Sequence, residues 1–432
     1  MKLSTQRASD GKEEITGRGS RRVESVAART FASLANPDYR TLWLGMLGLW
    51  MALQFQQVAR GYLAYKLTGS ALALGFVTLS LGLPRIFLSL VGGVIADRLP
   101  KRQVMLVTLG GLAFLSLLTA VLVSMGVIQI WMLIVIGVLQ GTLFSFQLPA
   151  RQSLIPELVS REQLANAMAL NNSGMTTTRI VGPALAGLVI SIPFAGLPAA
   201  FYGVTVGYLW VLYATWKIRV NGAPASKVHG AFWTDLRAGL SYIRRSAALV
   251  AILSLGFVPI AVGMPYQNLM PVFALAVLDR GAVGLGLLLA ASGVGAVIGT
   301  LFIAAVSETN RKALLQSILG GIFGAGLIAF TIVAAHGWFI WSLVALLVVG
   351  FAGDSYLALN STLLVLNTDR KMYGRVMSMY LMTQSIRPIS VLPMSALVDV
   401  YGAPATVGAA GIFTVVFIGA VAIFYSDYRK IG

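Results

Sequence analysis

The 432-residue sequence contains no cysteine and only two histidines, His229 and His336. The absence of cysteine excludes disulfides, thiolate metal sites and a cysteine nucleophile. A metal centre or a hydrolytic site also needs several histidine or carboxylate side chains close together, and the sequence offers no such group. We therefore expect no enzymatic activity, no bound metal and no cofactor.

Charge is also scarce and unevenly spread. Only 11% of the residues are charged, whereas about a quarter are charged in a typical soluble domain. No charged residue occurs from Gln103 to Ala150 or from Ser246 to Leu278. Both runs exceed the roughly 20 apolar residues that cross a bilayer. The chain is 57% hydrophobic with a mean hydropathy of +0.82, which predicts a multi-pass membrane protein.

The hydrophobic windows predict an all-α membrane protein with twelve transmembrane helices in two six-helix bundles. The expected spans are 41–63, 71–95, 103–125, 128–148, 164–192, 196–216, 248–277, 282–306, 313–335, 338–362, 374–398 and 405–425. The expected domains are a basic cytoplasmic tail at 1–36, a first bundle at 37–216, a cytoplasmic linker with an amphipathic helix at 217–246, and a second bundle at 247–432.

The basic residues orient the chain in the membrane. The formal net charge of +17 would also suit a nucleic-acid-binding protein, but 26 of the 32 Lys and Arg residues fall in the two tails and in alternate short loops. Lys66 and Arg280 alone fall in the other loops. Because basic loops stay in the cytoplasm, we expect both termini inside the cell, in the cell (inner) membrane, with lipid and not nucleic acid as the surroundings.

The two halves of the chain look related. The segments "GTLFSFQLPARQ" and "GFAGDSYLALNS" align 209 residues apart, with Gly141 on Gly350. Repeats of this kind place a substrate site at their interface, near the middle of the membrane.

Five charged residues lie inside the expected spans and away from their outermost residues, and such residues usually mark function. They are Arg60, Arg85, Arg179, Asp354 and Arg387. We take Asp354, the single acid, as a candidate for proton coupling, with Arg387 or Arg179 as its basic partner; a purely structural ion pair is the alternative. Counted at about 1.5 Å per residue, Asp354 and Arg387 lie roughly 12 and 20 Å from the inner surface.

Four arginines against one acid predict an electropositive cavity that favours anionic or zwitterionic amphiphiles. Arg85 is a candidate for the cavity lining. Arg60 stands near the end of its expected span, so of the four arginines it most readily extends its side chain to the membrane surface instead.

The segment "GGVIADRLPKR" combines glycines, an acid and three cations where the second span meets its inner loop. Such a charge cluster can act as a conformational latch. The segment resembles the signature loop of the major facilitator superfamily. The matching positions are Gly93, Asp97, Arg98, Lys101 and Arg102, with Pro100 in place of the usual glycine. The second-half copy, "AAVSETNRKAL", keeps Arg311 and Lys312 but has Ser307 where the acid would stand.

Further segments resemble the enterobactin exporter and macrolide efflux subgroup of this superfamily over nearly the whole chain after the tail. They include "NPDYRTLWLG", "LPARQSLIPELVSREQLANAMALNNS" and "RIVGPALAGLV". Gly182, Pro183 and Gly187 resemble part of the antiporter motif of drug–proton exchangers, although Thr178 and Ala186 replace two usual glycines.

The resemblance implies a monomeric secondary transporter that exports a small molecule by alternating access, coupled to protons. Gly137 stands where many proton-coupled relatives have an arginine, so their proton pathway does not carry over directly. Import or flipping of a nutrient or lysolipid is the alternative for the same fold, and a receptor without transport activity is a third possibility.

In this architecture the first, fourth, seventh and tenth helices line the transport path. Their amides are candidates for substrate contact, with hydrogen bonding between helices as the alternative. These candidates are Gln54, Gln57, Gln140, Gln147, Gln267, Asn268 and Asn360.

Overall fold

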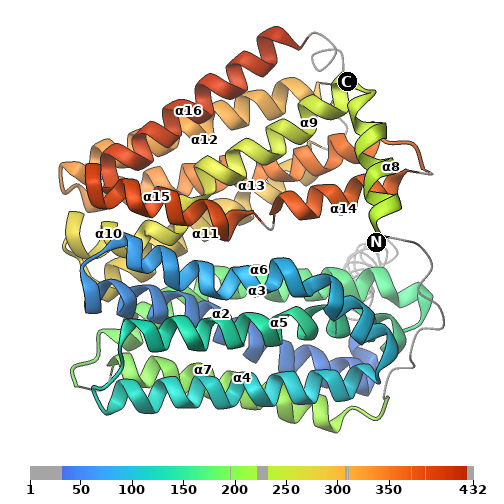
Figure 1. Cartoon of the computed structure of the whole chain (residues 1–432), viewed down its shortest axis with the longest axis vertical. Coiled ribbons are helices and arrows are strands. Elements are labelled where there is room, and N and C mark those ends of the chain that lie inside the picture. Colours follow the sequence, from blue (N-terminus) through green and yellow to red (C-terminus); the bar gives the residue numbers. More distant parts are fainter. Residues whose placement is uncertain are drawn as a thin grey trace, which may run out of the picture.

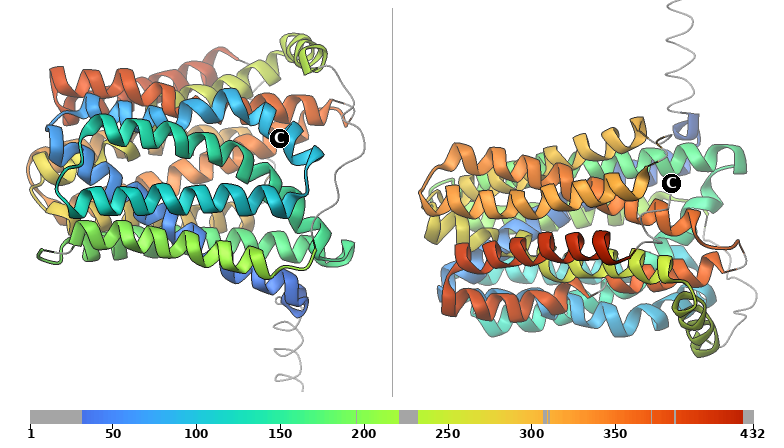
Figure 2. Two further views of the ribbon diagram at one scale, coloured as in Figure 1. Left: turned by 60° about the horizontal axis from the view of Figure 1, so that its bottom comes forward. Right: turned by 90° about the horizontal axis from the view of Figure 1, so that it is seen from above.

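The computed structural model describes residues 32–194, 196–220, 232–306, 309, 311–370, 372–384 and 386–425, and for 89–98, 232–236 and 384 it describes the backbone alone. Every regular element in these residues is a helix. The first half of the chain forms the lower bundle in Figure 1 and the second half forms the upper one. The helices of both bundles run along one common direction, as Figure 2 also shows.

The first bundle contains six long helices. They are α2 (Pro37–Thr68), α3 (Ala71–Arg98), α4 (Lys101–Ser124), α5 (Ile130–Leu158), α6 (Arg161–Ile190) and α7 (Gly196–Lys217). The ends of α2 follow from its sequence: the Asn36 side chain accepts hydrogen bonds from the backbone N–H groups of Asp38 and Tyr39, and Gly69 ends the helix with φ of 65°.

The last residues of the predicted tail at 1–36 contact the first bundle. Ala32–Ala35 forms a short 3₁₀ helix, η1, that packs on α6. The backbone N–H and the hydroxyl of Ser33, which is fully buried, donate to Asn166 Oδ1 at 3.1 and 2.7 Å. These hydrogen bonds fix a polar segment that composition alone assigns to a loose tail; residues 1–31 lie outside the described part.

The described part of the linker includes the helix α8 (Phe232–Arg244). It lies at the right-hand end of the bundles in Figure 1 and packs on the second bundle. Ile243 is buried, whereas Arg244 and Arg245 are exposed, and the Tyr242 hydroxyl donates to Asp369 Oδ2 at 3.1 Å. This distribution is that of a helix lying along a surface; the side chain of Leu236, expected on its apolar face, lies outside the described part.

The second bundle is less regular. Its elements are α9 (Ala247–Val258), η2 (Pro259–Gly263), η3 (Met264–Leu269), α10 (Met270–Val272), η4 (Phe273–Val277), α11 (Gly281–Ala305), α12 (Lys312–Ala335), α13 (Phe339–Leu366), α14 (Tyr373–Gln384), α15 (Arg387–Tyr401) and α16 (Ala403–Phe424). The predicted span 248–277 is one apolar segment, but it changes from α to π and 3₁₀ geometry after Val258. Pro259, Pro265 and Pro271 lack the N–H that a regular α-helix requires, which accounts for the changes.

The predicted span 374–398 was wrong in its continuity. The chain forms two helices there, α14 and α15, and Arg387 is the first residue of α15. Its depth therefore cannot be counted as a uniform rise from Tyr373. The prediction that Arg60 stands near the end of its span was also wrong. Helix α2 continues to Thr68 and places Arg60 well inside the helix.

Nine helical segments in the described part are long and apolar enough to cross a membrane. They are 71–88, 101–124, 130–158, 196–217, 247–277, 281–305, 312–335, 339–366 and 403–424. Helices α2, α6 and the α14–α15 pair lie beside them but do not meet this measure. Helices α2 and α6 carry charged or polar side chains that line the cavity between the bundles, so their sequences are less apolar than those of the outer helices. The α14–α15 pair is interrupted.

The packing of the two bundles repeats. A Cβ atom on Gly141 of α5 would lie 2.4 Å from the carbonyl oxygen of Leu81 in α3. A Cβ atom on Gly350 of α13 would lie 2.0 Å from the carbonyl oxygen of Ser292 in α11. Only glycine permits such contact between helix backbones. The sequence alignment of Gly141 with Gly350 therefore corresponds to the same crossing in each bundle.

The two bundles meet through two equivalent helix pairs, α3 with α15 and α11 with α6. The glycine contacts are Gly75 with Leu392, Gly82 with Pro388, Gly286 with Pro183 and Gly293 with Arg179. They lie toward the end of the molecule where α3 and α11 begin and α6 and α15 end, which we call the contact end. The helix α8 lies at the opposite end.

Candidate functional site

A cavity with two connected lobes lies between the bundles. The first lobe, about 310 Å³, is lined mainly by α2 and α3, with Phe144 of α5 and residues of the second bundle. The second lobe, about 260 Å³, contains Arg179 and Asp354. Both lobes share Gln57, Gln267, Leu289 and Arg387, so they form one space. A cavity at this interface is where repeats of this kind place a substrate.

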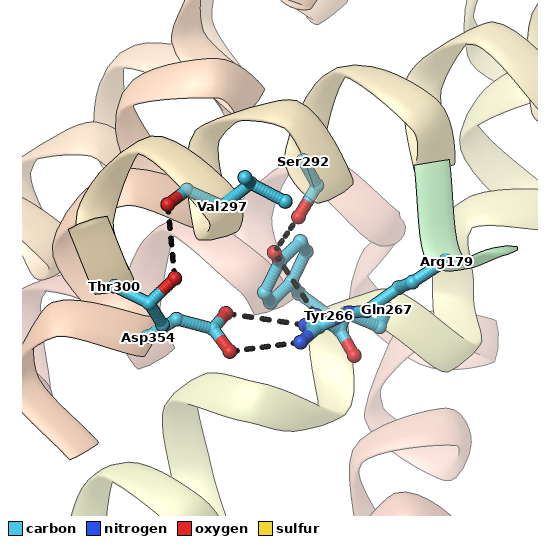
Figure 3. Close-up of polar contacts among 7 residues, drawn as sticks. All are labelled: Arg179, Tyr266, Gln267, Ser292, Val297, Thr300 and Asp354. Carbon is cyan, nitrogen blue, oxygen red and sulfur yellow. Dashed lines mark hydrogen bonds and ion pairs between the residues drawn. The ribbon is translucent and has the colours of Figure 1, made fainter. Parts of the chain in front are cut away.

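An ion pair joins the bundles inside the second lobe (Figure 3). Arg179 of α6 donates from Nη1 to Asp354 Oδ1 at 2.8 Å and from Nη2 to Asp354 Oδ2 at 3.1 Å. This two-bond geometry fits a planar guanidinium on a carboxylate. The Arg179 and Asp354 side chains are 40% and 21% exposed, so the pair faces the cavity and is not enclosed in packed protein.

Two further polar contacts lie beside the pair (Figure 3). The Tyr266 hydroxyl lies 2.8 Å from the Ser292 hydroxyl, and Gln267 Nε2 donates to Tyr266 at 3.4 Å. Arg387 lines the same lobe and lies close enough to Arg179 and Asp354 to be influenced by both charges. Sequence reasoning missed Tyr266 and Ser292, although Tyr266 directly precedes the candidate Gln267.

The remaining arginines of the cavity differ in their partners. Arg60 is buried and donates to Gln140 Oε1 at 2.8 Å and to the carbonyl oxygen of Leu133. Arg85 stacks on Phe144, with its guanidinium carbon 4.4 Å from the ring centroid. Arg85 makes no hydrogen bond or ion pair with any residue that the structure describes.

The amide candidates divide into two groups. Gln54, Gln57, Gln267 and Asn268 line the cavity. Three others lie outside the lining of its two lobes, namely Gln140, Gln147 and Asn360.

Buried interhelical contacts hold two of these three. Gln140 accepts hydrogen bonds from Gln56 and Arg60, and Asn360 donates to the carbonyl oxygen of Ile252 at 2.8 Å. A role of Gln140 and Asn360 in substrate contact remains a prediction. In this arrangement their side chains form hydrogen bonds between helices, which is the alternative role.

The antiporter-like residues of α6 lie at helix contacts. A Cβ atom on Gly182 would lie 2.5 Å from Gln54 Cβ of α2, and one on Gly187 would lie 2.5 Å from the carbonyl oxygen of Ala282 in α11. Pro183 lines the second lobe. These residues thus bring α6 close both to its own bundle and to the other one.

The predicted latch is described only in part. The side chains of Gly93, Asp97 and Arg98 lie outside the described part. Lys101 pairs with Glu157 of α5, and Arg102 donates to the carbonyl oxygens of Thr215 and Trp216 at 3.2 and 2.5 Å. Both contacts stay within the first bundle, so a latch between conformations remains a prediction.

An acid that sequence reasoning missed joins the bundles at the contact end. The carboxylate of Asp399, near the end of α15, accepts hydrogen bonds at the start of α3. The donors are the Ser70 hydroxyl at 2.6 Å and the backbone N–H groups of Ala71 and Leu72 at 2.7 and 3.0 Å. Asp399 thus caps a helix of the other bundle. Asp399 directly follows the expected span 374–398, and an acid at the end of a span was the sequence feature that could have indicated it.

Comparison with solved structures supports this architecture. A bacterial homologue of the iron transporter ferroportin, described in an inward-facing state, has a TM-score of 0.69 at 16% identity and covers 90% of this chain and 99% of its own. A POT family transporter reaches 0.71 at 12% identity, with coverage of 91% and 96%. These similarities establish the transporter fold.

Three sequence relatives are transporters. The staphyloferrin A transporter of Staphylococcus aureus is 24% identical over 90% of this chain and 93% of its own length. Macrolide efflux protein A of Streptococcus pyogenes is 23% identical, covering 79% and 84%. The enterobactin exporter EntS of Salmonella typhimurium is 26% identical, covering 77% and 76%.

The transmembrane secretion effector family matches residues 28–420, which is nearly all of the chain. This extent agrees with the helical bundles, the apolar segments and the central cavity described above. The chain therefore belongs to the transmembrane secretion effector family of major facilitator transporters, as a multi-pass membrane protein that carries a small molecule.

Proposed function

We propose that this protein exports amphiphilic small molecules across the cell membrane in exchange for protons, by alternating access to its central cavity. The observation that carries the proposal is the Arg179–Asp354 ion pair. It joins the two bundles inside the cavity, and Asp354 is the one acid among the described residues that line the two lobes. A proton on this carboxylate would therefore change a contact on which the arrangement of the bundles depends.

The chemistry of the pair suggests how coupling works. The ionised carboxylate holds the guanidinium through two charge-assisted hydrogen bonds, which are roughly twice as strong as neutral ones. Protonation of Asp354 removes its charge and frees Arg179. The bundles then lose one contact that favours the present arrangement, and Arg179 becomes available to an anionic group of the substrate.

The proposed topology has twelve spans with both termini in the cytoplasm. It adds α2, α6 and the α14–α15 pair to the nine apolar segments, because these three lie among them and line the cavity. Lys66 and Arg280 adjoin the contact end, whereas α8 with its exposed arginines lies at the other. In this proposed topology the contact end faces outward.

The proposed substrate is an anionic or zwitterionic amphiphile, drug-like or siderophore-like. Three arginines and one aspartate line the two lobes beyond the buried Arg60, which leaves excess positive charge. The relatives transport staphyloferrin A, macrolides and enterobactin according to their names, and the last two are efflux or export proteins. A single chain encloses the whole cavity between its own bundles, which suits a monomer.

The test is substrate flux in proteoliposomes with an imposed pH gradient. Staphyloferrin A, enterobactin and a macrolide serve as probes for the wild type and for Asp354→Asn. We expect gradient-driven flux of at least one probe in the wild type, and its loss in Asp354→Asn with binding retained. The matched control is Asp279→Asn, which removes an exposed acid; asparagine tolerates the positive φ of 48° found there.

Two results would overturn the proposal in different ways. Flux that ignores the gradient in the wild type would point to a uniporter or to another coupling ion. Gradient-driven flux that survives in Asp354→Asn would leave proton exchange intact but assign Asp354 to a structural ion pair.

A further inference from the structure

Arg85 is the most unusual cation of the cavity because it lacks a polar partner. Its Nε atom is buried without a hydrogen bond, and no acceptor or acid among the described residues pairs with the rest of its guanidinium. A guanidinium with a buried nitrogen normally has such a partner, since an unpaired polar group is costly to bury. The missing partner is therefore expected to arrive with a ligand.

Two other arginines of the cavity have polar partners for their Nη groups, although Arg60 also has a buried Nε without a hydrogen bond. Arg179 holds Asp354, and Arg60 donates to an amide oxygen and a backbone carbonyl. Arg85 has neither kind of partner, although Arg60 lies near enough to add a second positive charge. The surroundings of Arg85 thus favour a negative group in the first lobe.

Phe144 contacts the Arg85 guanidinium and orients it for such a group. The guanidinium carbon lies over the ring, 4.4 Å from its centroid, which is within the range of a cation–π interaction. The N–H groups of a guanidinium can bind the two oxygens of a carboxylate through two parallel hydrogen bonds. Phe144 and Arg85 both line the first lobe, so Arg85 borders the cavity at this contact.

We propose that Arg85, oriented by Phe144, is the subsite that binds a carboxylate of the transported molecule. The carboxylate lies in the first lobe, and the body of the molecule extends past Gln57 and Gln267 toward the second lobe. Because the Arg179–Asp354 pair lies in that second lobe, carboxylate binding at Arg85 does not require the pair to break. Recognition and coupling are thus assigned to different residues of one cavity.

This inference rests on the proposed function for the view that the cavity holds the substrate, but it can fail separately. The test is equilibrium binding without any gradient, in nanodiscs of zwitterionic lipid. The probes are 9-anthracenecarboxylate and 9-anthracenecarboxamide, which share one fluorescent body and differ in the ionised carboxylate. Fluorescence anisotropy is measured against empty nanodiscs.

We expect the wild type to bind the carboxylate at least about tenfold more tightly than the amide, as a charge-assisted pair of hydrogen bonds implies. Arg85→Gln should abolish this preference while leaving amide binding within about twofold. Arg85→Lys should keep part of it, because lysine carries the charge but cannot present two parallel donors. Lys66→Gln, which removes an exposed charge from the last turn of α2, should keep all of it.

The outcomes separate the two ideas. An unchanged preference in Arg85→Gln, or no preference for the carboxylate in the wild type, would overturn the carboxylate subsite. Asp354→Asn should retain the preference even though it stops gradient-driven flux. If the flux test fails while the preference depends on Arg85, the subsite stands and only proton coupling is lost.

Discussion

In the first bundle α5 crosses α3 at Gly141, and in the second α13 crosses α11 at Gly350, each against a backbone carbonyl oxygen. The interfaces between the bundles repeat in the same way: α3 meets α15 through Gly75 and Gly82, and α11 meets α6 through Gly286 and Gly293. The backbone framework of the transporter is thus duplicated.

The charges of the two bundles are not duplicated. The first bundle supplies Arg60, Arg85 and Arg179 to the cavity lining, with no acid among its described lining residues, whereas the second supplies Asp354 and Arg387. Packing contacts repeat because both bundles must form the same helix crossings. The polar side chains differ because ligand binding and coupling need only one copy of each group.

The first prediction tests the shared packing and has the largest expected effect. Gly141→Leu and Gly350→Leu should each abolish folded, monodisperse protein, because even a Cβ would overlap a backbone oxygen that cannot move aside, and overpacking typically costs about 1–3 kcal/mol or more. Gel filtration in detergent measures the result. Gly321→Leu, with open space around its Cβ position, is the control. Tolerance of one leucine but not of the other would show that the crossings are not equivalent.

The second prediction compares the polar interiors of the two bundles. Gln140 Oε1 accepts from Gln56 at 2.6 Å and from Arg60 at 2.8 Å. Gln140→Leu leaves two donors unsatisfied, one of them charged, and should destabilise by about 3 kcal/mol. Asn360→Leu loses one bond and also removes an oxygen without a partner, so it should change stability by about 1 kcal/mol or less.

Thermal unfolding in detergent gives the order of these two variants. The midpoint temperature should fall clearly more for Gln140→Leu than for Asn360→Leu. Equal shifts would mean that the hydrogen bonds of Gln56 and Arg60 to Gln140 contribute no more to stability than the single hydrogen bond of Asn360.

The third prediction concerns Asp399, which joins the bundles at the contact end, and has the smallest expected effect. Slight burial raises the pKa of Asp399, but hydrogen bonds from Ser70 and from the N–H groups of Leu72 and Ala71 outweigh it and hold the pKa below the usual carboxyl value. The contact therefore stabilises the folded protein at pH values above the usual carboxyl pKa of about 3.9. This stabilisation is lost as the pH falls through the lowered pKa of Asp399.

The measurement is the difference in unfolding midpoint between wild type and Asp399→Ala as a function of pH. We expect a contribution of about 0.5 kcal/mol, since the carboxylate is mostly solvated, that is constant from pH 7 to about 5 and shrinks below about pH 4. A difference that disappears near neutral pH would contradict this assignment of the Asp399 charge.

Much of the architecture could be predicted from the sequence because hydrophobic length is a local property of the chain. Of the twelve windows, nine correspond to helices that meet the measure for membrane crossing. The breaks within 247–277 and between α14 and α15 were harder to predict, because proline allows either a bend or an interruption and the neighbouring helices decide between them.

By itself the sequence determined that this is a membrane protein of helices with one acid and several arginines inside its spans, since composition and run length depend only on residue order. Only the tertiary structure decided that Asp354 pairs with Arg179 and that Arg85 stacks on Phe144 without a polar partner. It also decided that Gln140 joins helices outside the two main lobes. The physical reason is distance: Arg179 and Asp354 are 175 residues apart in the chain, and the packing of the two bundles alone brings them to 2.8 Å.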